Sequence, residues 1–332
     1  MSSTVLKGSL SLTLACACTF SVTARLNAQS VIATIPAAGF VGGGSVDPIA
    51  RRAYIPTGNN NGVSAVVTVI DERTNTVART INFPTAWAAV SVALNPLNGL
   101  LYVGTGSGGL YVANARTGAT VGFVNVNAAS VALNPVTDKI YVSDFESNIY
   151  VIDGNTNHIE ADIPINSILQ NIAVNPITNR IYAAIEDFNP GSVYVIDGGS
   201  NQIIAQAPAG SGLTFDVAVD PLLDTFYSGD QFGTATAYNG GNNKQVTAIS
   251  LPNQPAGVAA DPLTHTIYVS ESTGNGVAVI NGSTNTLTET VAVRPQPVYM
   301  TDDPVNKLLY VGCQGVDSNG FPTYSISVVK TN

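Results

Sequence analysis

Histidine and cysteine are scarce in this sequence, and their positions exclude several kinds of catalytic site. The chain of 332 residues has 2 histidines and 3 cysteines. His158 and His265 lie in segments that read as turns, so neither is placed to act as a buried metal ligand or as the base of a catalytic triad. Cys16 and Cys18 fall within the first 28 residues, and only Cys313 follows them. The sequence contains no CxxC pair, no HExxH motif and no haem-attachment motif.

Charged residues are also few, and the balance is acidic. They make up 11% of the chain, and the formal net charge is −9. A negative surface disfavours binding to nucleic acid and to anionic lipid. With 31 glycines and no shift in composition along the chain, nothing reads as a linker or a disordered tail. We expect a compact β protein with almost no helix.

Residues 1–28 have the features of a cleaved secretory signal. Lys7 precedes an apolar stretch, Leu10–Val22, and the segment ends in Leu-Asn-Ala, which predicts cleavage after Ala28. The apolar stretch is shorter than the ~20 residues that a membrane span needs, so we predict no transmembrane segment. The protein is therefore expected to be secreted or periplasmic. A lipid anchor on Cys16 is a second possibility, although the residues before it match a lipoprotein signal poorly.

Residues 29–332 are predicted to form a single domain. This length is enough for a large core. Cys313 is the only cysteine in it, so the exported chain has no internal disulfide. Packed β-sheets and closure of the structure on itself must supply its stability.

One stretch, Val131–Ile163, is repeated with changes in seven places. Its sequence is VALNPVTDKIYVSDFESNIYVIDGNTNHIEADI. Four short β-branched and aromatic runs alternate with clusters of Asn, Asp, Gly, Pro and Thr, which favour turns. Each copy therefore predicts a four-stranded antiparallel meander. One such sheet cannot bury both faces alone, so the copies must stack or close into a ring.

A proline in the first turn marks the register of each copy. These repeat prolines all follow Asp or Asn, and they are Pro48, Pro96, Pro135, Pro176, Pro221, Pro262 and Pro304. Their spacing of 39 to 48 residues matches propeller blades. A tyrosine lies six residues after each one: Tyr54, Tyr102, Tyr141, Tyr182, Tyr227, Tyr268 and Tyr310. A repeated aromatic residue favours packing between neighbouring sheets over a catalytic role.

The two ends of the repeat array are complementary. The last copy ends after Ser325–Lys330, its third strand, and lacks a fourth. Val31–Pro36 matches the fourth strand of other copies, such as Val77–Ile81, and has no first three strands before it. We predict an all-β, seven-bladed β-propeller of four-stranded antiparallel blades, closed by the N-terminal strand completing the C-terminal blade.

The repeat resembles the YVTN-type seven-bladed β-propeller family, which includes YncE-like proteins. The resemblance lies in V-A-[LV]-[ND]-P-x-T-[ND]-x-[IL]-Y-V followed by V-x-V-I-D-G-x-T-N, and it extends over nearly all of residues 29–332. The tetrapeptide itself reads YVSD at Tyr141 and YVSE at Tyr268. The resemblance implies the propeller fold, and it supports a binding or interaction role. It is a poor guide to function, because the repeated residues are structural in that family too.

The strand order predicts which loops share a face of the ring. If the first strand of each blade lines the channel, the loops after the second and fourth strands meet at one face, here called the variable face. These loops carry the acidic residues Asp144, Glu146, Glu186, Asp187, Asp216, Asp230, Glu271 and Asp317. A ring of carboxylates would attract a cation, a basic peptide or a metal. Alternatively, the acidic loops only keep the protein soluble.

We select candidate site residues from this face. The candidate ligand-binding residues are Trp87, Asp144, Gln170, Asp216, Gln254 and Gln296. The candidate metal ligands are Glu186, Asp230 and Glu271, with calcium as the candidate ion because hard cations take oxygen ligands. Trp87 is the only tryptophan in the chain, and packing in the core is its alternative role.

Three functions fit these observations. The favoured one is a monomeric, non-catalytic binding module that contacts a protein or a small cationic ligand through the acidic variable face. The second is a metal-dependent hydrolase or lactonase, with a divalent ion at the channel mouth activating water. The third is a structural protein of the cell envelope. The fold alone does not choose among them.

Overall fold

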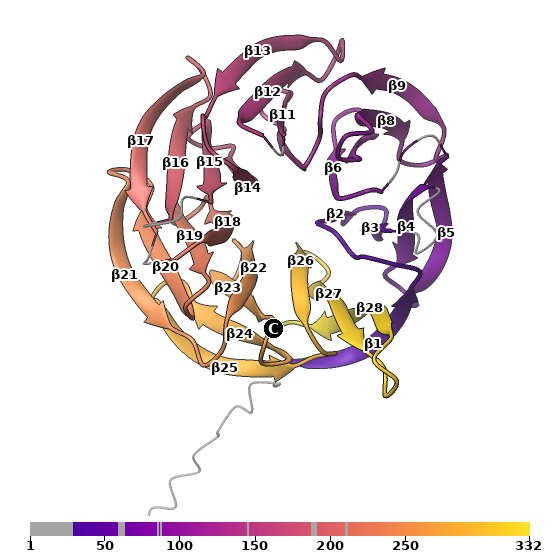
Figure 1. Ribbon diagram of the computed structural model, residues 1–332, viewed down its shortest axis with the longest axis vertical. Helices are drawn as coiled ribbons and strands as arrows, with labels where there is room; N and C mark the ends of the chain where they lie inside the picture. The colour runs from indigo at the N-terminus through magenta and orange to yellow at the C-terminus, as the bar shows by residue number, and fades with distance from the viewer. Residues whose placement is uncertain are drawn as a thin grey trace, which may run out of the picture.

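Each repeat folds into the meander that its turn residues predict. The computed structural model describes residues 29–58, 64–84, 86, 88–144, 146–186, 191–209 and 212–332. It contains seven four-stranded antiparallel sheets, the blades, arranged in a ring (Figure 1). The described residues form no helix, and thus none that could span a membrane. The predicted signal segment, 1–28, lies outside the described residues.

Four concentric sets of strands build the ring (Figure 1). The innermost strands are β2 (Ser45–Asp47), β6 (Ser91–Asn95), β10 (Ser130–Asn134), β14 (Leu169–Asn175), β18 (Thr214–Asp220), β22 (Pro255–Asp261) and β26 (Pro297–Asp303). The second strands are β3 (Arg52–Thr57), β7 (Leu100–Gly104), β11 (Lys139–Ser143), β15 (Arg180–Ile185), β19 (Thr225–Asp230), β23 (Thr266–Glu271) and β27 (Leu308–Val316).

The two outer sets complete the blades. The third strands are β4 (Ala65–Asp71), β8 (Leu110–Asn114), β12 (Asn148–Asp153), β16 (Ser192–Asp197), β20 (Thr234–Asn239), β24 (Gly276–Asn281) and β28 (Pro322–Lys330). The outermost strands are β5 (Thr76–Phe83), β9 (Thr120–Val124), β13 (Ile159–Pro164), β17 (Gln202–Pro208), β21 (Lys244–Ser250), β25 (Thr286–Ala292) and β1 (Ser30–Ala37). Blade 1 is β2–β5, blades 2 to 6 follow in order, and blade 7 is β26–β28 with β1.

The N-terminal strand closes the ring, as the sequence predicts. Strand β1 pairs antiparallel with β28, with Ile35 opposite Ile326 and Thr34 opposite Ser327. The sheet order is β1-β28-β27-β26, so the two ends of the described chain share one blade. This pairing covers the edge of β28 that would otherwise be open.

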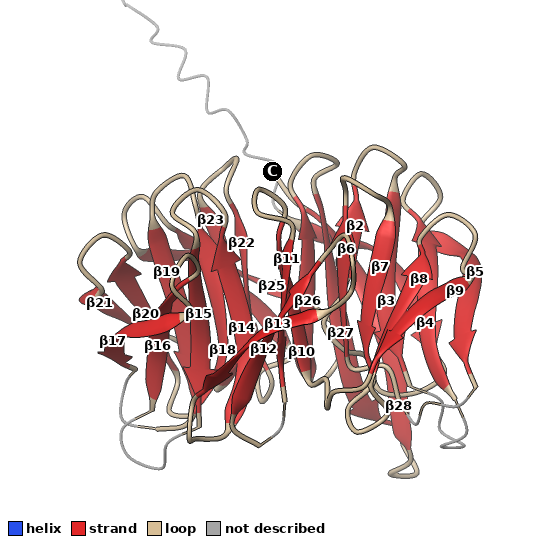
Figure 2. Cartoon of the chain, turned by 90° about the horizontal axis from the view of Figure 1, so that it is seen from above, coloured by secondary structure: helices blue, strands red, loops and turns tan. Residues whose placement is uncertain are grey.

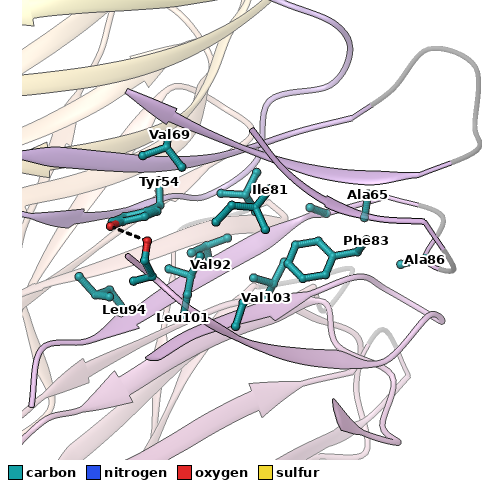
Figure 3. Close-up of a cluster of buried hydrophobic side chains, with 14 residues drawn as sticks. Tyr54, Ala65, Val69, Ile81, Phe83, Ala86, Val92, Leu94, Leu101 and Val103 are labelled. Atoms are coloured by element: carbon teal, nitrogen blue, oxygen red, sulfur yellow. Dashed lines mark hydrogen bonds between the residues drawn. The ribbon is translucent and has the colours of Figure 1, made fainter. Parts of the chain in front are cut away.

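The repeat tyrosines pack between neighbouring blades. All seven are at most 3% exposed. Tyr54 lies in a hydrophobic cluster made by blades 1 and 2, together with Val69, Ile81, Leu94 and Leu101 (Figure 3). Its hydroxyl donates to the carbonyl of Ala115 in blade 2 at 3.2 Å. The structural role predicted for this position is confirmed.

A polar contact near the channel also joins successive blades. It links the residue before one repeat proline to the third residue after the next repeat proline. We call this contact the latch. It is Asn95 to Asp138 (2.6 Å), Asn134 to Asn179 (2.8 Å), Asn175 to Asp224 (3.0 Å) and Asp220 to His265 (2.8 Å). The second partner has a positive φ each time, between 47° and 56°, which Asn and Asp tolerate better than most residues.

Candidate functional site

The acidic residues of the variable face occupy a structural position of the repeat. Nine residues after each repeat proline, where the second strand ends, stand Thr57, Thr105, Asp144, Ile185, Asp230, Glu271 and Cys313. All seven side chains are at most 3% exposed. Three of the predicted site residues therefore point into the protein instead of standing on the rim of the channel.

Asp144 and Asp230 shape the hairpins that follow them. The Oδ1 atom of Asp144 accepts hydrogen bonds from the main-chain N–H groups of Glu146, Ser147 and Asn148 at 3.0, 2.7 and 2.8 Å. Asp230 accepts in the same way from Phe232 at 2.8 Å and, more weakly, from Thr234 at 3.2 Å. An Asp at the start of a tight turn bonds its own backbone in this manner.

Glu271 and Glu186 each accept a hydrogen bond from a nearby side-chain amide. Glu271 is fully buried, and its Oε2 accepts from Asn253 Nδ2 at 3.4 Å. Burial raises its pKa above the ordinary value. Glu186 is half-buried and accepts a hydrogen bond from Gln170 Nε2.

The three candidate metal ligands do not gather in one place. Glu186, Asp230 and Glu271 belong to blades 4, 5 and 6. Within the described ranges, no three His, Cys, Asp or Glu side chains form a group that could hold a metal ion. Calcium binding by this face stays a prediction.

The other candidates are dispersed as well. Gln254 lies between two loops, where its carbonyl accepts from Ser272 N at 2.9 Å and its N–H donates to Thr273 Oγ1 at 3.2 Å. Gln296 is exposed, and its carbonyl accepts from Gln314 N at 3.0 Å. Trp87 lies outside the described residues.

At the mouth of the channel the structure brings together a set of mostly polar residues, of which only Asp216 was predicted. They stand five residues before each repeat proline, at the start of the innermost strands, and we call this the mouth position. It is occupied by Gly43, Ser91, Ser130, Asn171, Asp216, Gly257 and Tyr299. The innermost strands of neighbouring blades lie side by side around the channel (Figure 1).

Hydrogen bonds connect the mouth positions of blades 3, 4 and 5, and a further one reaches the main chain of blade 6. Ser130 Oγ donates to Asn171 Oδ1, and Asn171 Nδ2 donates to Asp216 Oδ1. Asp216 Oδ2 then accepts from the N–H of Val258 at 2.8 Å. Burial raises the pKa of Asp216 to about 6, and these donors partly oppose the rise.

A small hollow of about 140 Å³ opens beside this network. It is lined by Phe40, Gly43, Val90, Ser91, Ala129, Ser130, Gln170, Asn171 and Tyr299. The rings of Phe40 and Tyr299 meet edge to face with centroids 5.7 Å apart. Burial, with the nearby charge of Asp216, raises the pKa of Tyr299 to about 12, so its phenol is neutral at physiological pH.

Of the predicted ligand-binding residues, Gln170 lines this hollow and Asp216 lies in the network beside it. Ser91, Ser130, Asn171 and Tyr299 were not predicted from the sequence. The register of the repeat contains the signal, because five of the seven copies have a polar or aromatic residue at this position and all but blade 1 have Val, Ile or Met directly after it.

Comparison with known proteins assigns no family to the chain. No protein-family model matches it, and no curated protein matches it significantly in sequence.

Proposed function

We propose that this protein is a secreted or periplasmic, non-catalytic binding module that takes a small cationic group, an amine or a guanidinium, in the hollow at the channel mouth. The observation that supports the proposal is the connected set of polar side chains at the mouth position. A rigid ring that presents loops and side chains at one mouth suits such a role.

The hollow presents hydrogen-bond acceptors. The side-chain amides of Gln170 and Asn171 each donate to a carboxylate, Glu186 and Asp216. The Asn171 amide oxygen already accepts from Ser130 Oγ and from the N–H of Ile172. The Gln170 amide oxygen and the serine hydroxyls are therefore the acceptors that the lining offers. Two carboxylates thus stand directly behind the lining, and they favour a positively charged donor.

We also propose that the chain belongs to the YVTN-type propellers. The repeat motif with its Asn-Pro turn and the tyrosine six residues later supports this, as does the seven-bladed ring.

Calorimetric titration with agmatine, a small guanidinium compound, tests the binding function. We expect one site in the parent protein, weakened about tenfold by Asp216→Asn because one nearby charge is lost. The control is Asp162→Asn, which removes an exposed carboxylate from the outermost strand β13 and should leave binding unchanged. Equal weakening by both variants would mean that only net charge matters, and the proposal would fail.

The same titration at several pH values gives a second readout. Because the pKa of Asp216 is about 6, affinity for agmatine should fall as the pH drops below 6 and the carboxylate is protonated. Asp216→Asn should remove that component of the fall. A parallel titration with calcium tests the metal site predicted at Glu186, Asp230 and Glu271, and with it the hydrolase alternative.

A further inference from the structure

The contact between blades 1 and 2 lacks a side chain that the next four contacts use. At the latch, the residues here are Asp47 and Gly99. Glycine has no side chain to bridge the blades, whereas Asn179 at the same repeat position accepts from Asn134 at 2.8 Å. Gly99 keeps the same left-handed backbone, with φ at 69° against 50° for Asn179. The backbone of the latch is therefore preserved and only the bridging atoms are missing.

A cleft of about 570 Å³ opens at this point, on the face opposite the channel mouth. It is lined by Asp47, Ala50, Arg52, Tyr54, Val69, Ala78, Arg79, Asn98, Gly99, Asn114, Ala115 and Arg116. Tyr54, Val69 and Ala115 are buried and form its floor. Figure 3 shows Tyr54 and Val69 at one end of the cluster between blades 1 and 2, away from Phe83 and Ala86. The volume lies in the range of small-molecule sites.

Three arginines surround this floor. Arg79 stands where the other blades have Ala33, Gly122, Ala161, Ala205, Thr247 and Glu289. Its Nη2 donates to the Ala115 carbonyl at 2.5 Å, so its guanidinium reaches across to blade 2. Arg52 is held by Asp71 at 2.7 Å, and Arg116 lies at the exposed rim.

The cleft is positively charged in an acidic protein. Asp47 is the only carboxylate among its lining residues, while the chain as a whole has a net charge of −9. The Asp47 Oδ1 atom accepts from the N–H groups of Ile49 and Ala50 in its own turn, at 3.1 and 2.9 Å. An arginine fork binds carboxylates and phosphates in two-point contacts, and the Val69 and Tyr54 side chains give an apolar surface beneath.

We propose that this cleft binds a small organic anion, with its carboxylate or phosphate group on the arginines and its apolar part against Val69 and Tyr54. The site is separate from the proposed cation site at the channel mouth. Loss of the latch at Gly99 and gain of an arginine at position 79 both occur at this one interface, and together they create a space and a charge suited to the anion.

Calorimetric titration of the purified protein with benzoate, phenyl phosphate and neutral benzamide tests the proposal. We expect benzoate or phenyl phosphate to bind at one site and benzamide to bind at least tenfold more weakly. The preferred acid tells whether the natural ligand carries a carboxylate or a phosphate. Equal binding of benzamide, or binding by neither acid, overturns the proposal.

Two variants locate the site. Gly99→Asn introduces the residue that blade 4 has at this position. A Cβ here meets no atom within 4 Å, and Asn tolerates the positive φ, so the variant should fold while its side chain narrows the cleft. Arg79→Gln removes the charge and keeps most of the side chain. Both should reduce affinity at least tenfold, whereas Lys244→Ala, which removes an exposed charge at the start of β21, should not. Unchanged binding by Gly99→Asn and Arg79→Gln would overturn the assignment.

Discussion

The repeat tyrosines occupy one position, but their hydroxyl groups differ in what they bond. The single O–H of Tyr227 is shared between two acceptors, the carbonyl of Gly282 at 3.2 Å and Asn285 Oδ1 at 3.0 Å. The hydroxyl of Tyr141 is buried and has no hydrogen-bond partner among the described residues. Burying a hydroxyl without a partner costs free energy, whereas a satisfied one contributes modestly to stability.

This difference gives a matched pair of substitutions. Tyr227→Phe should lower the free energy of unfolding by about 1–2 kcal/mol, because it leaves a buried carbonyl and an amide oxygen unpaired. Tyr141→Phe should be neutral or stabilising. Chemical denaturation of the two variants checks this, and a larger loss for Tyr141→Phe would contradict the role assigned to the hydroxyls.

The raised pKa of Asp302 should make the stability of the protein depend on pH. Asp302 lines the channel beside Met300 and Thr301, and neither carboxylate oxygen has a hydrogen-bond partner in the described structure. Burial, with the charges of Asp261 and Asp303, raises its pKa to about 9. The folded protein thus keeps a proton that the unfolded chain loses near pH 4, so stability falls as the pH rises from about 4 to about 9.

Asp302→Asn should remove this loss. We expect the variant to have a melting temperature at least about 2 °C above the parent at pH 8 and no advantage at pH 4. Differential scanning calorimetry at both pH values measures it. An equal effect at the two pH values would show that the carboxyl does not titrate as described.

At the scale of the strand, closure of the ring depends on the inward side of β1. Ile35 is 5% exposed and packs with Ile326 and Val328, whereas Ile32 on the same strand is 48% exposed. Ile35→Ala should destabilise the protein by about 2–4 kcal/mol through lost burial and a cavity.

Ile32→Ala is the control on the same strand, and it should cost less than about 1 kcal/mol. Urea unfolding of the two variants compares them. Similar small effects would mean that β1 contributes little to holding blade 7 closed.

The strands were predictable because each repeat carries its own turn residues. Pro135 and the Asp-Gly turn at Asp153 punctuate the repeat, and the missing fourth strand at the C terminus indicated where Val31–Pro36 belongs. It was harder to predict that the side chains of Asp144, Asp230 and Glu271 are buried. Asp144 is of a residue type common in surface loops. It occupies the same repeat position as Thr105, Ile185 and Cys313. Only that register indicates a buried position.

In the molecule as a whole, the residues that stabilise the ring differ from those proposed to bind ligands. The tyrosines recur in every blade and the latch at four of the contacts between blades, and both pack one blade on the next. Residues that break the pattern gather at two places: the mouth position around Asn171 and Asp216, and the cleft around Arg79 and Gly99. Figure 2 shows the blades edge-on, with loops at two opposite faces of the ring. Departures from a stabilising pattern are expected at functional sites.

The sequence indicated on which face of the ring the proposed cation site lies, but it did not indicate most of the residues that form the site. The strand order indicates that Gln170 and Asp216 lie at one end of the channel. The bridges from Ser130 to Asn171 and from Asn171 to Asp216 join successive blades, about one repeat apart in the sequence. Such contacts depend on how the ring closes, which no single repeat encodes.

The most direct test of the binding function is a crystal structure of the protein grown with agmatine. We expect the guanidinium group in the hollow at the channel mouth, within hydrogen-bond distance of Gln170 or of the hydroxyl of Ser91 or Ser130. Agmatine bound at another face, or an empty mouth at saturating concentration, would contradict it.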